Sequence, residues 1–256
     1  MKNENSIIEN KFSLAFQNHK KNNFKDAEKL YKEILDSKPK HLEAIRYLGT
    51  LFAQNKKINL AKKMFLKGIE IKPNDPSINN NLGNTFFELG EIKKAIPFYE
   101  RAIQIQPNYA DAHYNLGVVL QELGEHQQAI SYYEKAIQIQ PNYADAHYNL
   151  GVILKELGEH QKAISCYEKA IEIKPNYAEA YNNLGNIQKE LGKLTETILS
   201  YKKAIEIKPN YAEAYNNLGI TFKELGEHQQ AISYYKKAIQ IEPDNLTSHW
   251  LSMNIF

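Results

Sequence analysis

The chain has 256 residues, of which 43% are hydrophobic and 24% are charged, and its formal net charge is +2. The apolar fraction is sufficient for a core, whereas the nearly balanced charge argues against nucleic acid or an anionic membrane as a partner. The single cysteine, Cys166, excludes an intrachain disulfide. The first residues lack the apolar run of a signal peptide, and no stretch approaches the ~20 apolar residues that cross a bilayer, so we expect a cytoplasmic protein.

Prolines recur along the chain at a fixed interval of 34 residues. They are Pro39, Pro73, Pro107, Pro141, Pro175, Pro209 and Pro243. A fixed period of this size is typical of stacked structural repeats, each of which contacts only its neighbours. The period therefore predicts one elongated array, which acts by presenting a long surface and not through a catalytic pocket.

The repeat from Ala110 to Tyr143 shows what one unit contains. His113, Leu116 and Leu120 fall at helical spacing and predict a first helix, which Gly124 ends because glycine tolerates the left-handed conformation of a helix end. A second apolar stripe through Ala129, Tyr133 and Ala136 predicts a second helix, and Pro141 ends it. The unit is therefore predicted to be helix, tight turn, helix, tight turn.

Asparagines near each helix start predict N-terminal caps. Asn142 is followed three residues later by Asp145, a spacing at which a capping residue meets its acidic partner. The same pattern recurs as Asn108 with Asp111, Asn176 with Glu179, and Asn210 with Glu213.

A Leu-Gly pair, a later Ala and Tyr, and the closing Pro resemble the tetratricopeptide repeat (TPR). The Leu-Gly pairs are Leu116-Gly117, Leu150-Gly151, Leu184-Gly185 and Leu218-Gly219. The resemblance implies an all-α fold, a right-handed superhelix of antiparallel helix pairs whose first helices line a concave groove. It covers seven units: 8–41, 42–75, 76–109, 110–143, 144–177, 178–211 and 212–245. Residues 1–7 are expected to be an N-terminal tail.

The first two units depart from this pattern. Leu14-Ala15 replaces the Leu-Gly pair in the first unit, and Asn22 stands where later units have the turn glycine. Lys56 replaces that glycine in the second unit. We therefore interpret the first unit as a degenerate cap.

Asparagine recurs at one position of the first helix in five consecutive units. Asn81, Asn115, Asn149, Asn183 and Asn217 form this ladder. If the leucines face the core, the resemblance places the ladder in the concave groove, and an asparagine amide can pair with both the N–H and the C=O of a foreign peptide bond. The tetratricopeptide domain of O-linked N-acetylglucosamine transferases carries a comparable ladder that holds peptide backbones. We therefore predict peptide binding by the ladder, with Tyr114 and Tyr148 at its border; the alternative is a solvated polar face multiplied by duplication.

Acidic residues beside the ladder favour a polar or basic partner. They are Asp111, Asp145, Glu179, Glu213, Glu122, Glu156, Glu190 and Glu224. Lys155, Lys189 and Lys223 moderate their field.

Motifs for catalysis and metal binding do not occur in the sequence. There is no phosphate-binding glycine loop, zinc-protease helix motif or serine elbow. His113 and His147 lie one repeat apart, too far to share a metal ion, and are interpreted as packing residues. Cys166 replaces the Tyr132 of the preceding unit and is interpreted as structural. We therefore expect no enzymatic activity, no catalytic residue, no metal and no cofactor.

Residues 246–256 begin a further helix of apolar character that includes Trp250. No polar capping helix follows it, so we expect that the chain continues in a longer protein or that this helix contacts another molecule. Three functions remain open. They are a scaffold that binds an extended protein segment in its groove, the substrate-recruiting arm of a larger enzyme such as a glycosyltransferase, and a self-assembling structural array.

Overall fold

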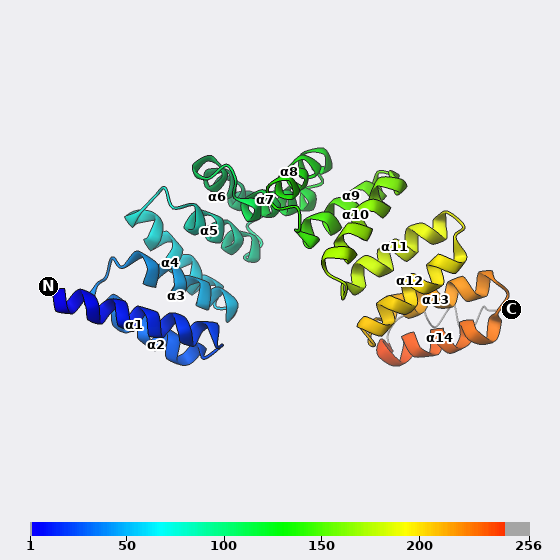
Figure 1. Cartoon of the computed structure of the whole chain (residues 1–256), viewed down its shortest axis with the longest axis horizontal. Helices are drawn as coiled ribbons and strands as arrows, with labels where there is room; N and C mark the ends of the chain where they lie inside the picture. Colours follow the sequence, from blue (N-terminus) through cyan, green and yellow to red (C-terminus); the bar gives the residue numbers. More distant parts are fainter. Residues whose placement is uncertain (1, 244–256) are drawn as a thin grey trace. The chain divides into compact units, whose positions relative to one another are not determined.

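The computed structural model describes residues 2–243, and every regular element in this range is an α-helix (Figure 1). Consecutive helices form antiparallel pairs joined by tight turns. Their bounds are α1 Lys2–Lys20, α2 Phe24–Ser37, α3 Leu42–Gln54, α4 Ile58–Ile71, α5 Pro76–Glu88, α6 Ile92–Ile105, α7 Ala110–Glu122, α8 His126–Ile139, α9 Ala144–Glu156, α10 His160–Ile173, α11 Ala178–Glu190, α12 Leu194–Ile207, α13 Ala212–Glu224 and α14 His228–Ile241.

The helices belong to two compact units, residues 1–139 and 140–256. The N-terminal unit contains α1 to α8, and the C-terminal unit contains α9 to α14. Within each unit a helix packs against its pair partner and against the next pair, and the first helices of successive pairs also touch. The prediction of an all-α fold of superhelical helix-turn-helix repeats is confirmed.

The helix starts can be compared with the predicted units. The first helices α3, α5, α7, α9, α11 and α13 start at residues 42, 76, 110, 144, 178 and 212, which open the second to seventh predicted units. At the N-terminus α1 already begins at Lys2, so residues 2–7 are helical and not a tail. The expected apolar helix at 246–256 lies outside the described residues.

A left-handed residue closes each pair's turn. After α7, Gly124 has a φ of 76°, its N–H donates to the Gln121 carbonyl at 2.9 Å, and the Glu125 N–H donates to the Leu120 carbonyl at 2.8 Å. These two bonds are the Schellman motif, which satisfies carbonyls that the helix end would leave unpaired. Asn22 and Lys56 adopt the same conformation, with φ of 60° and 57°.

The core of each pair is a close approach of a glycine on the first helix to an aromatic ring on the second. A Cβ added to Gly117 would lie 2.7 Å from Cε1 of Tyr133, which is itself fully buried. Side chains in protein cores pack at the density of organic crystals, so no larger residue fits here without movement. The glycine of the Leu-Gly pair and the later tyrosine of the repeat are thus the two sides of one packing contact.

The predicted asparagine caps are not observed. The N-cap residues of α7, α9, α11 and α13 are tyrosines, none of which makes a side-chain capping bond; they are Tyr109, Tyr143, Tyr177 and Tyr211. Each helix starts one residue later than the asparagine pattern suggests, because a backbone turn such as Tyr109 N–H to the Gln106 carbonyl precedes it. Only Asp75 and His41 cap a first helix through their side chains within the described residues.

Candidate functional site

The five ladder asparagines lie on first helices and are all half-buried. Asn81 on α5 and Asn115 on α7 belong to the N-terminal unit. Asn149 on α9, Asn183 on α11 and Asn217 on α13 belong to the C-terminal unit. Each side chain is thus partly exposed on a helix that is packed in the array, so it could contact a partner from a rigid position.

Ladder asparagines are hydrogen-bonded to the preceding repeat, which the sequence did not predict. Nδ2 of Asn115 donates to Oδ1 of Asn80 at 3.0 Å, and Nδ2 of Asn183 donates to the Tyr148 hydroxyl at 3.0 Å. Nδ2 of Asn217 donates to Oδ1 of Asn182 at 3.2 Å. In all three cases the acceptor residue lies 35 positions earlier in the chain. We call this recurrent bond the inter-repeat tie.

In three repeats another asparagine directly precedes the ladder asparagine: Asn80, Asn182 and Asn216. All three are buried, and Asn80 and Asn182 accept the tie, whereas Oδ1 of Asn216 has no hydrogen-bond partner among the described residues. Asn182 accepts the tie from Asn217 and donates through Nδ2 to Glu213 Oε1 at 2.9 Å. A buried amide is costly unless it is hydrogen-bonded, so these bonds explain why asparagine is tolerated in the helix.

Asn217 also donates to Oδ1 of Asn186 at 3.1 Å, and that same oxygen accepts the Tyr201 hydroxyl at 2.7 Å. The ladder is thereby joined to the aromatic core of the C-terminal unit. Such a network holds its members in one rotamer, because each side chain has several partners.

Tyr148 lies inside the ladder and not only at its border. It is half-buried, its ring lies 4.8 Å from that of Tyr177, and its hydroxyl accepts the tie from Asn183. Burial and the nearby carboxylate of Glu179 raise the pKa of Tyr148. Tyr114 is half-buried, and its ring lies 5.8 Å from the Tyr133 ring.

Three of the acidic residues beside the ladder in the C-terminal unit have lysine partners. Glu179 receives Nζ of Lys208 at 2.9 Å, Asp145 lies 3.8 Å from Lys174, and Glu224 lies 3.8 Å from Lys189. Burial opposes ionisation of Glu179, but the bond from Lys208, a backbone hydrogen bond and the charges of Lys208 and Lys174 together lower its pKa. These pairs reduce the negative field that the sequence suggests.

On α1 and α3 of the N-terminal unit aromatic side chains pack together, which the sequence analysis did not predict. Phe16 on α1 meets Tyr47 on α3 edge-to-face with ring centroids 4.9 Å apart, and the Arg46 guanidinium lies 4.9 Å from the Tyr47 ring centre. Tyr47 occupies in its repeat the position that asparagine occupies in the ladder. The tyrosine at this position could have indicated this aromatic packing from the sequence. It was missed because the sequence analysis considered only residues that recur between repeats.

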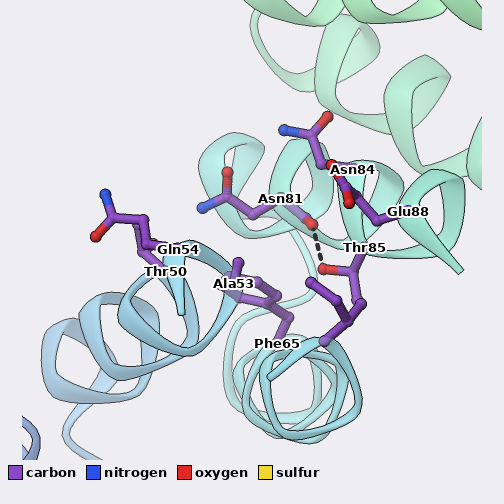
Figure 2. Close-up of a pocket in the computed structure, with 9 residues that line it drawn as sticks. Thr50, Ala53, Gln54, Phe65, Asn81, Asn84, Thr85 and Glu88 are labelled. Carbon is purple, nitrogen blue, oxygen red and sulfur yellow. Dashed lines mark hydrogen bonds between the residues drawn. The ribbon is translucent and has the colours of Figure 1, made fainter. Parts of the chain in front are cut away.

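A cavity of about 270 Å³ opens between α3 and α5, beside Asn81 (Figure 2). Thr50, Ala53 and Gln54 line it from α3, Ile58 and Phe65 from α4, and Asn81, Asn84, Thr85 and Glu88 from α5. In Figure 2 the Gln54 side chain extends from one helix that borders the cavity and the Asn81 side chain from the other.

The histidines interpreted as packing residues make backbone contacts. Nε2 of His113 lies 2.9 Å from the Pro107 carbonyl, and Nε2 of His147 lies 3.0 Å from the Pro141 carbonyl. Cys166 is half-buried on α10. Among residues 2–243, no three His, Cys, Asp or Glu side chains gather as metal ligands would. No helix of that range combines the length and the apolar character that a membrane span requires.

Models of the tetratricopeptide repeat match most of the chain. They cover residues 48–75, 83–124, 108–176, 166–198, 185–226 and 212–245. The comparison with curated proteins gave no match.

Solved structures of repeat proteins are similar to this chain. YrrB, described as a TPR protein with an unusual peptide-binding site, is 27% identical with a TM-score of 0.62, over 74% of this chain and 97% of YrrB. MamA is 30% identical with a TM-score of 0.59, over 63% of this chain and 95% of MamA. PilF of Pseudomonas aeruginosa, 19% identical with a TM-score of 0.76 over 83% of this chain and 96% of PilF, shares the fold. The chain therefore belongs to the tetratricopeptide repeat family.

Proposed function

We propose that this protein is a non-enzymatic scaffold whose helix-repeat units bind extended segments of partner proteins through their ladder asparagines. The inter-repeat tie carries the proposal. It occupies Nδ2 of Asn115, Asn183 and Asn217, whereas Oδ1 of these three residues accepts no hydrogen bond within the described residues. Each amide therefore presents an acceptor, in a fixed orientation, to the N–H of a partner backbone.

Because the ladder side chains are already oriented before binding, the free energy cost of binding a partner is lower. Immobilising a flexible side chain on association costs about 0.5–1.5 kcal/mol, and a side chain that is already tied avoids most of that cost. The two functions of the ladder are thus compatible, because the amide nitrogen stabilises the stack while the oxygen recognises the partner. The peptide-binding site of the similar protein YrrB supports peptide binding as a function of this kind of array.

The proposal predicts recognition of backbone more than of sequence. Because Glu179, Asp145 and Glu224 are paired with lysines, we expect the partner segment to be polar but binding to depend only weakly on salt. The cytoplasmic location stays a prediction, which a fluorescent fusion in the native cell would test.

The test uses short peptides selected on the wild-type protein from a random display library. Replacing Asn183 and Asn217 by alanine removes two acceptors, each worth about 0.5–1.5 kcal/mol, so affinity should fall about 5- to 150-fold. Asn176 and Asn210 are exposed turn residues, and the Asn176→Ala, Asn210→Ala variant is the matched control that should bind as wild type.

Fluorescence polarisation with peptides of unrelated sequence measures the effect, and circular dichroism verifies that both variants are folded. A folded ladder variant with unchanged affinity for every peptide would mean that the ladder is only a solvated face. Failure of the library to yield any binder would count against peptide binding as such.

A further inference from the structure

The cavity between α3 and α5 lies where the second repeat differs from its neighbours in the aromatic core. In three other repeats the tyrosine of the second helix donates its hydroxyl to the first helix: Tyr99 to Asn84, Tyr133 to Gln121 and Tyr201 to Asn186, each at 2.7 Å. The second repeat has Phe65 at this place, with no hydroxyl to extend.

The first helix of the same repeat does not fill the space. Thr50 and Ala53 stand where later repeats place the acceptors Asn84 or Asn186 and Gln121. Both are smaller than those acceptors. The missing hydroxyl and the two short side chains therefore account for the cavity, and the sequence difference is confined to this repeat.

The lining of the cavity combines apolar and polar side chains. Ala53, Ile58 and Phe65 contribute carbon atoms, Thr50, Thr85 and Glu88 contribute polar groups, and Gln54, Asn81 and Asn84 carry the amides that we call its rim. Its volume of about 270 Å³ exceeds the ~150 Å³ that suffices for a benzene ring in an apolar cavity. The size and lining fit one bulky apolar side chain better than a polar one, because the hydroxyls of Thr50 and Thr85 already donate to carbonyls of their own helices and Glu88 pairs with Lys56.

Asn81 differs from Asn115, Asn183 and Asn217 in a way that suits this cavity. The residue 35 positions before it, where the tie finds its acceptor, is Arg46, whose guanidinium only donates. The Asn81 side chain accordingly makes no hydrogen bond within the described residues. Both its donor and its acceptor are available at the rim.

We propose that this cavity anchors one bulky apolar side chain, such as leucine or phenylalanine, of the bound protein segment, while the Asn81 amide pairs with the peptide backbone next to it. The inference rests on the proposed function and adds specificity to it. Within the N-terminal unit, the second repeat then selects a segment with an apolar anchor.

The test fills the cavity with residues the chain already uses. The double variant Ala53→Gln, Phe65→Tyr recreates the Gln121–Tyr133 pair of the fourth repeat, so we expect it to be at least as stable as wild type. The matched control is Tyr133→Phe, which makes the opposite exchange in another pair and leaves the cavity intact.

The first measurement uses toluene as an apolar probe, followed by ligand-observed NMR. Wild type and Tyr133→Phe should bind toluene, and the filled variant should lose at least about tenfold in affinity, as expected when burial of an apolar side chain is prevented. Absence of toluene binding to wild type, or equal binding to the filled variant, would overturn the anchor site whatever the ladder does.

The second measurement uses the peptides selected on wild type. Replacing their apolar residue by alanine should weaken binding to wild type about tenfold to hundredfold and leave binding to the folded filled variant nearly unchanged. Equal losses with both proteins would overturn the anchor while leaving the ladder proposal intact. If toluene binds but no peptide is selected, the anchoring of a protein segment fails together with the proposed function.

Discussion

Lys56 has a left-handed φ of 57° at the end of α3, where the later repeats have glycine. A residue with a Cβ pays about 1–2 kcal/mol in this conformation. Its ion pair with Glu88, at 3.5 Å between exposed side chains, offsets little of that cost. We expect Lys56→Gly to raise the free energy of unfolding by about 0.5–1 kcal/mol, measured by urea denaturation.

Asn22 provides the comparison, because asparagine tolerates the left-handed conformation better than lysine does. Asn22→Gly should therefore gain less than Lys56→Gly. If both substitutions gain equally, or if neither does, backbone strain is not what separates these turns from the glycine turns.

The hydroxyls of the buried tyrosines are a second case in which single residues differ. Tyr235 is fully buried, and its hydroxyl has no hydrogen-bond partner among residues 2–243, whereas the Tyr201 hydroxyl donates to Asn186. An unsatisfied buried hydroxyl costs free energy, and Phe65 shows that the site accepts phenylalanine. We expect Tyr235→Phe to be neutral or stabilising and Tyr201→Phe to lose about 1 kcal/mol, again by urea denaturation. A larger loss for Tyr235→Phe would contradict this assignment.

At the scale of the elements, the first helices were predicted well because each carries an apolar stripe, and a glycine or another left-handed residue ends it. Their caps were predicted wrongly, because Asn108 and its equivalents are typical of caps and the sequence does not show that a backbone turn delays the helix start to Ala110. The inter-repeat tie was missed for another reason. It joins residues 35 positions apart, and only the packing of neighbouring helices shows that Asn115 meets Asn80.

The second helices make the fold sensitive to alkali. Burial, aided by Glu224, raises the pKa of Tyr235 to about 12, and burial raises the pKa values of Tyr99, Tyr167 and Tyr201 as well. In the unfolded chain these phenols ionise near pH 10. The folded form therefore keeps its protons while the unfolded form loses them, so the stabilising effect is complete below pH 10 and is lost as the pH rises to 12 and beyond.

We accordingly expect a steep fall in the denaturation midpoint between about pH 10 and 12, which urea denaturation followed by circular dichroism would measure. Tyr235→Phe removes one titrating phenol, so the denaturation midpoint of this variant should fall less steeply with pH. A midpoint independent of pH across this window would show that the tyrosines ionise without unfolding the helices.

At the scale of the whole molecule, each helix pair contacts only its neighbours along the chain within its unit. The fold class can therefore be predicted from the sequence, since a local pattern that repeats with a fixed period determines the contacts between neighbouring repeats. The anchor cavity does not follow, because it depends on what Phe65, Thr50 and Ala53 leave unfilled together. The ladder can be found in the sequence because asparagine repeats at one position, whereas the cavity lies at the repeat whose residues at these positions differ from the others.

Contacts of this local kind predict how the molecule responds to shortening. A variant that ends at Tyr211 lacks α13 and α14, yet α9 to α12 keep the contacts they make with one another. It also uncovers Tyr201, which packs in one cluster with Leu218 and Phe222. In a repeat array, stability is approximately the sum of the terms of each repeat and of its interfaces. We therefore expect the remaining residues to stay helical by circular dichroism, with a lower thermal midpoint and a greater tendency to aggregate. Loss of helix throughout residues 140–211 would show instead that the C-terminal unit folds only as a whole.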